Sequence, residues 1–239
     1  EYEIRYSRLE DPESAEVWEF EISNNQDDKN YVANGTKATV TITGLSPETL
    51  YNVWIKAKGK GGESSWSNGV PQRTDTLANP DVPRGLGLAS SVSLLEVGKD
   101  MSASSSDYLV VEWMKIDADI NNKDENKVYG YTVEFADNNK FMDSVIVNTS
   151  DDKKDSQNQS TDNNATTENE EKDENQISSD IFAKNIVQFK GLNANKDYYV
   201  KVKTVLTYTD PNSKKVIVKE SEFTTVVRLK TNTSNSEYD

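Results

Sequence analysis

The feature that most restricts the fold is an alternation of apolar and polar residues in short stretches along the chain. Clear examples are residues 2–6, 18–22, 40–43, 51–57, 109–113, 131–135 and 198–203. Because successive side chains of a β-strand point to opposite faces, this period predicts strands with one buried and one solvent-facing side. Turn signals such as Asn34-Gly35 and Asp210-Pro211 fall between the stretches. The chain is therefore expected to be all-β, with antiparallel strands.

The composition removes most kinds of chemical site. The 239 residues include no Cys and no His, which excludes disulfide scaffolds, thiol nucleophiles, His-containing triads and the usual transition-metal ligands. A formal charge of −14 disfavours nucleic acid as a partner. No apolar run has the roughly 18 residues of a membrane helix. Acidic residues are plentiful, but they lie in loops or at outward strand positions. We therefore predict no catalytic residue, no cofactor and no metal site.

Half of the net charge lies in one segment, residues 149–180. This segment has ten acidic and three basic residues, and Ile177 is its only large aliphatic residue. A segment of that composition buries too little apolar surface to offset the entropy lost on ordering. It is predicted to be a disordered acidic loop. The alternative is an acidic patch that attracts cations or basic partners.

The chain also repeats itself. Residues 130–135 match residues 1–6, and residues 191–204 match residues 44–57. In the longer pair, a Leu and a Tyr lie six residues apart, as Leu45 and Tyr51 and again as Leu192 and Tyr198. This spacing fits a corner between two strands, where the Leu fills the core and the Tyr hydroxyl returns to the backbone upstream. That arrangement is the tyrosine corner of Greek-key sandwiches.

With these motifs, the chain resembles tandem fibronectin type III domains. The resemblance implies immunoglobulin-like β-sandwiches. In the second domain it places strand B at 109–113, strand C at 131–135, strand C′ at 145–147, strand E near 186–189 and strand F from Tyr198 onward. In the first domain it places Glu1 at strand C, so that strands A and B are missing. We therefore expect the chain to continue upstream into further domains of a larger protein.

The expected organisation follows from these matches. Residues 1–76 form a partial domain with strands C to G, and residues 77–83 form a linker stiffened by two prolines. Residues 84–232 form a second domain that contains the acidic insert 149–180, and residues 233–239 form a tail.

One surface of the first domain is a candidate binding face. If Val53 and Ile55 point into the core, Trp54 points outward, and Trp66 follows on the probable next strand. Arg5 and Lys56 are expected on the same outer face. Exposed Trp beside cations can stack a sugar ring or anchor a partner protein. The alternative is structural, because the aliphatic stems of Lys and Arg often cover such rings.

A second candidate is a calcium loop at Asp117-x-Asp119-x-Asn121. These residues have the first spacings of an EF-hand loop, but Asn122 stands where the pattern needs Gly, and Val128 stands where it needs a bidentate Glu. A polar loop is the simpler interpretation.

The function favoured by the sequence is a non-catalytic spacer or protein-interaction module of a larger cell-surface or secreted protein. Its partner, whether protein or glycan, is not identified by the sequence. One alternative is an accessory region of a secreted carbohydrate-active enzyme that touches glycan through Trp54 and Trp66. Another is an adhesive segment that responds to cations through its acidic insert.

Overall fold

The structure is a computed structural model, and it describes residues 2–13, 18–22, 33–34, 37–38, 40–150 and 177–234. The chain divides into two compact units. Unit 1 comprises Glu1–Leu77 with Asp210–Lys215, and unit 2 comprises Ala78–Thr209 with Val216–Asp239. Most of the predicted acidic insert, residues 151–176, lies outside the described residues. Its expected disorder therefore stays a prediction.

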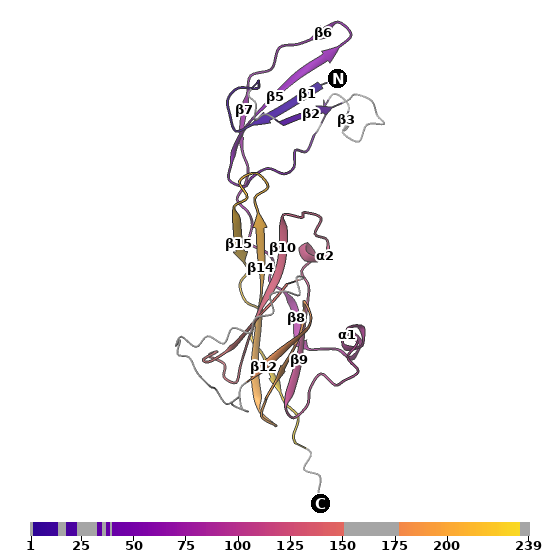
Figure 1. The fold of residues 1–239 in the computed structure, drawn as a ribbon, viewed down its shortest axis with the longest axis vertical. Coiled ribbons are helices and arrows are strands. Elements are labelled where there is room, and N and C mark those ends of the chain that lie inside the picture. Colours follow the sequence, from indigo (N-terminus) through magenta and orange to yellow (C-terminus); the bar gives the residue numbers. More distant parts are fainter. Residues whose placement is uncertain are drawn as a thin grey trace, which may run out of the picture. The chain divides into compact units, whose positions relative to one another are not determined.

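Unit 2 consists of two antiparallel sheets that face each other across a core (Figure 1). One sheet has the strand order β12-β13-β9-β8, with bounds Ser178–Ala183, Ile186–Lys190, Tyr108–Met114 and Arg84–Leu88. The other has the order β11-β10-β14-β15, with β16 also paired to β14; its bounds are Val145–Thr149, Lys127–Ala136, Asp197–Thr209, Val216–Glu220 and Val227–Lys230.

The core of unit 2 forms because each strand turns its apolar residues toward the opposite sheet. Leu109, Val111 and Trp113 on β9 meet Tyr131 and Val133 on β10, and all five are buried. This inward set is the one that the alternation predicts, and it confirms the two-sheet sandwich for this unit. The predicted strands B, C, C′, E and F correspond to β9, β10, β11, β13 and β14.

Two short helices lie in connections of unit 2. Helix α1 (Ser91–Glu96) follows β8 and buries Leu94 in a second, smaller apolar cluster with Val110 and Ile186. Helix α2 (Asp117–Ile120) lies between β9 and β10. The alternation of apolar and polar residues predicts neither helix, because they are only six and four residues long.

Unit 1 contains one sheet of the same kind among its described residues. Its strand order is β2-β1-β5-β6, with β7 also paired to β5; the bounds are Trp18–Ile22, Tyr2–Ser7, Leu50–Gly59, Gly62–Glu63 and Val70–Arg73. A small hairpin is formed by β3 (Ala33–Asn34) and β4 (Lys37–Ala38). Figure 1 shows β1, β2, β5 and β7 together in this sheet.

The sheets of the two units share one pairing register. In unit 1, Ile4 pairs with Ile55 and with Phe20. In unit 2, Val133 pairs with Val202 and with Val147. The last strand also matches, since β7 pairs with the start of β5 as β16 pairs with the start of β14. The short sequence repeat therefore extends through the pairing of the whole sheet.

Two expectations are corrected. The predicted strand at 40–43 is absent, and residues Val40 to Thr43 pair with no described strand. Its counterpart in unit 2, β13, lies between two partner strands, β9 and β12. The acidic insert is also shorter than predicted, because Thr149 is the last residue of β11 and Ser178 is the first residue of β12. Backbone pairing at both ends is the reason for the difference.

Candidate functional site

Both units have the predicted tyrosine corner. Tyr51 is buried, and its hydroxyl accepts a hydrogen bond from the backbone N–H of Ser46 at 3.0 Å. Tyr198 is buried likewise, and its hydroxyl accepts from the N–H of Asn193 at 2.7 Å. A Gly with φ near +75°, a conformation that suits a residue without Cβ, precedes each corner, at Gly44 (φ 74) and Gly191 (φ 75).

A threonine after the last strand holds each corner from the other side. The hydroxyl of Thr74 donates to the carbonyl of Ser46 at 2.6 Å and accepts from the N–H of Thr49 at 2.9 Å. In unit 2, the hydroxyl of Thr231 donates to the carbonyl of Asn193 at 2.6 Å and accepts from the N–H of Lys196 at 3.1 Å.

This clamp was not among the predictions, although the sequence contains a signal for it. Residues 73–76 read RTDT and residues 230–233 read KTNT, so the threonines recur at one position after the last strand.

A second repeated device lies in the segment that follows the longest strand of each unit, β5 in unit 1 and β14 in unit 2. There, two hydroxyl residues interrupt the regular strand pairing. In unit 1, Ser64 and Ser67 donate their N–H groups to Ala57 and Ile55 of β5, and their hydroxyls accept from the same two residues at 3.0 Å. The strand is thereby held without regular pairing.

Unit 2 has the same arrangement at Ser221 and Thr224. Their N–H groups donate to Thr204 and Val202 of β14, and their hydroxyls accept from these residues at 2.9 and 3.1 Å. Each device places one aromatic residue between its two hydroxyl residues, Trp66 in unit 1 and Phe223 in unit 2.

In unit 1, the aromatic residue lies against the predicted cations. Arg5 Cζ and Lys56 Nζ are each 4.7 Å from the centroid of the Trp66 ring. The indole N–H of Trp66 donates to the Glu13 carboxylate, with 2.6 Å between Nε1 and Oε1. Arg5 contacts the other oxygen of Glu13 at 3.1 Å. We call Arg5, Glu13, Lys56 and Trp66 the Trp66 cluster.

The structure brings Trp54 to the expected face but not to the surface. Trp54 pairs with Arg5 across β1 and β5, so the two share the outer face. Its side chain is nevertheless buried, with 4% of its surface exposed. The backbone at Gly69 contributes to this cover, because a Cβ added there would stand 2.8 Å from the indole Nε1 of Trp54. The expectation that Trp54 is exposed was therefore wrong.

Three cations surround a buried acid beside this cluster. Glu3 contacts Lys58 Nζ at 2.5 Å, Arg5 Nε at 2.9 Å and Lys56 Nζ at 3.8 Å. The hydrogen bond from Lys58, with that from Arg5, holds the pKa of the Glu3 carboxyl below its usual range and outweighs the opposing effect of burial. The positive charge of this face is thus largely neutralised within unit 1.

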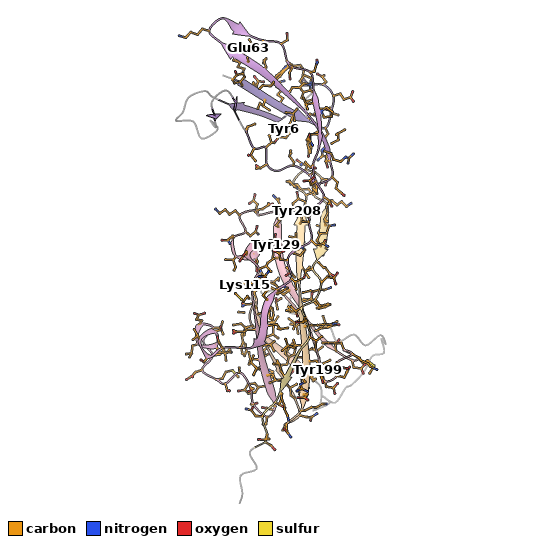
Figure 2. The ribbon with its side chains drawn as sticks, turned by 180° about the vertical axis from the view of Figure 1, so that it is seen from behind. Tyr6, Glu63, Lys115, Tyr129, Tyr199 and Tyr208 are labelled. Atoms are coloured by element: carbon orange, nitrogen blue, oxygen red, sulfur yellow. The ribbon has the colours of Figure 1, made fainter. Side chains whose placement is uncertain are left out.

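Hydrogen bonds also lower the pKa of two acids at the surface. The hydrogen bond from the Trp66 indole lowers the pKa of Glu13, and the hydrogen bond from Lys56 lowers the pKa of Glu63. Glu63 lies on β6 beside the end of β5, and Figure 2 shows its position in unit 1.

Unit 2 repeats the stack with other residues. Lys201 Nζ and Lys203 Nζ lie 4.4 and 5.1 Å from the Phe223 ring centroid. Lys203 also pairs with Glu220 at 2.5 Å, as Lys56 pairs with Glu63 at 2.8 Å in unit 1. Because both units have it, the stack is first of all part of the sheet's construction, worth about 0.5–1 kcal/mol at an exposed site.

In the candidate calcium loop, the carboxylate of Asp119 already contacts other side chains of the protein. Asp119 Oδ1 pairs with Lys184 Nζ at 2.7 Å, and Asp119 Oδ2 accepts from the hydroxyl of Tyr131 at 2.9 Å. Asp117 and Asp119 lie in the short helix α2 rather than in a calcium-binding loop. Among the described residues, no three acidic side chains gather as potential metal ligands. Within the same part of the chain, no helix is long and apolar enough to cross a membrane.

Comparison with known proteins fits this geometry. Residues 1–73 match the family model of the fibronectin type III domain. No curated protein is similar enough in sequence to match the chain. Among solved structures, that of the chicken CNTN1 FN1–FN3 domains shares 14% identity at a TM-score of 0.35, covering 97% of this chain and 53% of that one. The chain therefore spans about half the length of that structure.

The family match and the antiparallel sheets together define an all-β protein with a fibronectin-like sandwich. Fibronectin type III domains generally act as non-catalytic spacers or protein-interaction modules, and they commonly occur in extracellular or cell-surface proteins.

Proposed function

We propose that the chain is a tandem of two fibronectin type III-like units and that it spaces or presents other parts of a larger cell-surface or secreted protein. In this tandem, the first fibronectin-like domain occupies residues 1–76, the linker residues 77–83 and the second domain residues 84–232. These bounds follow the sequence repeat, whereas the compact unit 1 also contains Leu77 and Asp210–Lys215. The family match covers only the first unit, so the tandem rests on the repeat.

The observation that carries this proposal is the recurrence of three devices at matching positions. Both units have the tyrosine corner, the threonine clamp and the hydroxyl-held interruption with its aromatic residue. Each device fixes backbone rather than presenting a reactive group to solvent. Their joint recurrence supports a structural scaffold more than a catalyst.

The interaction face of unit 1 is narrower than the sequence suggested. Trp66, Arg5 and Lys56 remain as its proposed contact residues, since Trp66 is half-buried and keeps part of its ring accessible. Trp54 is buried and has no free ring to offer a sugar. This weakens the alternative of a glycan-binding accessory region and favours a protein partner.

Surface exposure on the source cell tests the proposal. Antibodies raised against unit 2 should label intact, unpermeabilised cells or detect the protein in the culture medium. An antibody against a cytosolic protein serves as the control for cell integrity. If unit 2 is found only after permeabilisation and never in the medium, the proposed function is wrong.

A further inference from the structure

We propose that Asn68 is a site of spontaneous deamidation, at which the side-chain amide leaves as ammonia and a carboxylate takes its place. Asn68 is exposed and is followed by Gly69, which is also exposed. The reaction closes a ring between the Asn side chain and the next backbone nitrogen, and a glycine at the next position has no side chain to hinder it. This inference does not depend on the proposed function.

Asn68 and Gly69 form a β-bulge opposite Trp54 on β5. The chain is held to β5 on both sides of the bulge, by the N–H of Ser67 on the carbonyl of Ile55 at 2.9 Å and by the pairing of Val70 with Val53. Between these two points, two residues oppose the single residue Trp54. A bulge of this kind leaves its extra residue out of the ladder of backbone pairs.

The two reacting groups carry no hydrogen bond in the part of the chain that the structure describes. Neither the side-chain amide of Asn68 nor the N–H of Gly69 has a partner there, whereas the backbone carbonyl of Asn68 accepts from the hydroxyl of Ser67 at 3.1 Å. An N–H that belongs to a strand pair must be released by local opening before it can react. The N–H of Gly69 lies outside the pairing, so this step is not needed.

The packing of Trp54 favours the glycine that makes Asn68 reactive. A Cβ added at Gly69 would stand 2.8 Å from Nε1 and 3.1 Å from Cε2 of the buried Trp54 ring. Any side chain at this position would therefore press on the ring, and overpacking of this kind destabilises a protein. The neighbour that least hinders ring closure is thus also the one that the fold requires.

Unit 2 has the same bulge without the reactive pair. The holding contacts recur there as the N–H of Thr224 on the carbonyl of Val202 and the pairing of Val227 with Val200. Thr225 and Val226 therefore oppose Lys201, the counterpart of Trp54. Thr225 has no amide to lose, and the place of Gly69 is taken by Val226, which is 46% exposed. The bulge itself does not need Asn-Gly, so the reactive pair is particular to unit 1.

The reaction needs no reagent other than water. The backbone nitrogen of Gly69 gives its proton to solvent and attacks Cγ of Asn68, so that an N–Cγ bond forms, the Cγ–Nδ2 bond breaks and ammonia leaves. The product is a cyclic succinimide, which water opens at either of its two carbonyl carbons. One opening gives aspartate with the original backbone, and the other gives isoaspartate, whose backbone runs through Cγ. Both products add a negative charge beside Trp54.

Peptide mapping of the folded full chain, aged at mildly alkaline pH, tests the proposal. The peptide that contains Asn68 should convert into an aspartate and an isoaspartate form, which chromatography separates and mass spectrometry finds one mass unit heavier. The rate should lie within about tenfold of the rate in a free peptide of residues 64–73, because no strand pair has to open first. A slower rate in the folded chain, or the absence of both products, overturns the proposal.

Asn79 is the matched control in the same digest. It is exposed as well, but it precedes Pro80, whose nitrogen has no proton to lose and cannot close the ring. Asn79 should therefore stay unmodified in the aged chain. In a second chain, Asn68→Gln would have to close a six-membered ring and should react far more slowly. Equal rates at Asn68 and Asn79, or at Asn68 and its Gln variant, contradict ring closure by Gly69.

Discussion

The hydroxyl of Thr231 makes two short hydrogen bonds at the corner of unit 2, and it lies 3.3 Å from a third partner, the carbonyl of Lys196. It holds the carbonyl of Asn193 and the N–H of Lys196 on the two sides of the corner, and the residue itself is buried. A buried polar group left without a partner costs about 1–3 kcal/mol.

Thr231→Val keeps the shape of the side chain and removes all hydrogen bonds of the hydroxyl. We expect the free energy of unfolding of unit 2 to fall by about 1–3 kcal/mol, measured by urea denaturation. Thr233→Val, two residues later and exposed, is the matched control and should change the free energy by less than about 0.5 kcal/mol. Equal effects of the two substitutions would show that the clamp does not bear on stability.

Because of Glu3, the stability of unit 1 is expected to depend on pH in the acid range. The pKa of Glu3 is lowered in the folded chain, chiefly by the hydrogen bond from Lys58. A lowered native pKa contributes stability that is complete above the unfolded value of about 4.3 and is lost as the pH falls through the native value. The contribution is therefore present at pH 7 and disappears in the acid range below about pH 4.

Glu3→Gln removes this contribution. The variant should be less stable than the parent chain at pH 7, and the difference should shrink as the pH is lowered toward 3. Urea unfolding followed by tryptophan fluorescence measures it in unit 1 when every chain carries Trp113→Phe, because the remaining tryptophans all lie in unit 1. Glu10→Gln, at an exposed position of the same unit, serves as control. A difference that stays constant from pH 7 to pH 3 would rule out the ion pairs of Glu3 as its source.

At the scale of elements, one buried ion pair ties helix α2 to the turn between β12 and β13. Asp119 and Lys184 are both almost fully buried, and Asp119 also holds the hydroxyl of Tyr131. Removing one partner of such a pair leaves a buried charge and costs about 3–5 kcal/mol, whereas replacing both with apolar residues is often neutral.

Asp119→Leu alone should therefore destabilise unit 2 by about 3–5 kcal/mol. The double variant Asp119→Leu, Lys184→Met should recover most of this loss, as measured by thermal and urea unfolding. Lys190→Met, which removes an ion pair with Asp180 at the surface, is the control for the loss of a lysine charge. If the double variant is as unstable as the single one, the uncompensated charge is not the cause.

The approach of β10 to β11 depends on Gly130. A Cβ at this position would stand 2.6 Å from the carbonyl oxygen of Thr149, which belongs to the paired backbone and cannot rotate away. Gly130→Ala should destabilise unit 2 by about 1–3 kcal/mol, measured by urea unfolding. Gly87→Ala on β8 has open space around its Cβ and is the control. A tolerated Gly130→Ala would mean that β11 can move outward at little cost.

The sequence predicted the elements whose signal is local. The alternation around Tyr131 and the spacing from Leu192 to Tyr198 lie within single strands or one corner, and both predictions are confirmed. The burial of Trp54 could not be predicted this way, because it involves a contact with Gly69, which lies on a different segment. The prediction of a strand at residues 40–43 was wrong for a similar reason. An alternating segment becomes a strand only when a partner strand pairs with it.

The candidate site was predicted in part. The sequence placed Arg5, Lys56 and Trp66 together, and the structure brings all three into contact. Nothing in the sequence indicated Glu13, whose contact with Trp66 joins residues 53 positions apart in the chain. The repeat at Ser64 and Ser221 was also missed, because two hydroxyl residues three apart are too common to be a signal alone.

At the scale of the whole molecule, the two units repeat one sheet and differ in what covers it. Unit 2 contains both sheets of its sandwich, whereas the described residues of unit 1 contain the sheet that the tyrosine corner anchors. Each corner uses hydrogen bonds within its own unit. Independent folding is the property that a spacer built from such units requires.

The central claim is that the chain carries two separate units of one design, and calorimetry of the full chain tests it most directly. Tyr51→Phe and Tyr198→Phe each remove one corner hydrogen bond, worth about 1 kcal/mol. This loss lowers the midpoint by about 4–8 °C for a domain of the size of unit 1 and by about 2–4 °C for one of the size of unit 2. Two transitions are expected, with Tyr51→Phe lowering only one midpoint and Tyr198→Phe only the other. A single transition, or two that both move with either substitution, would contradict the claim.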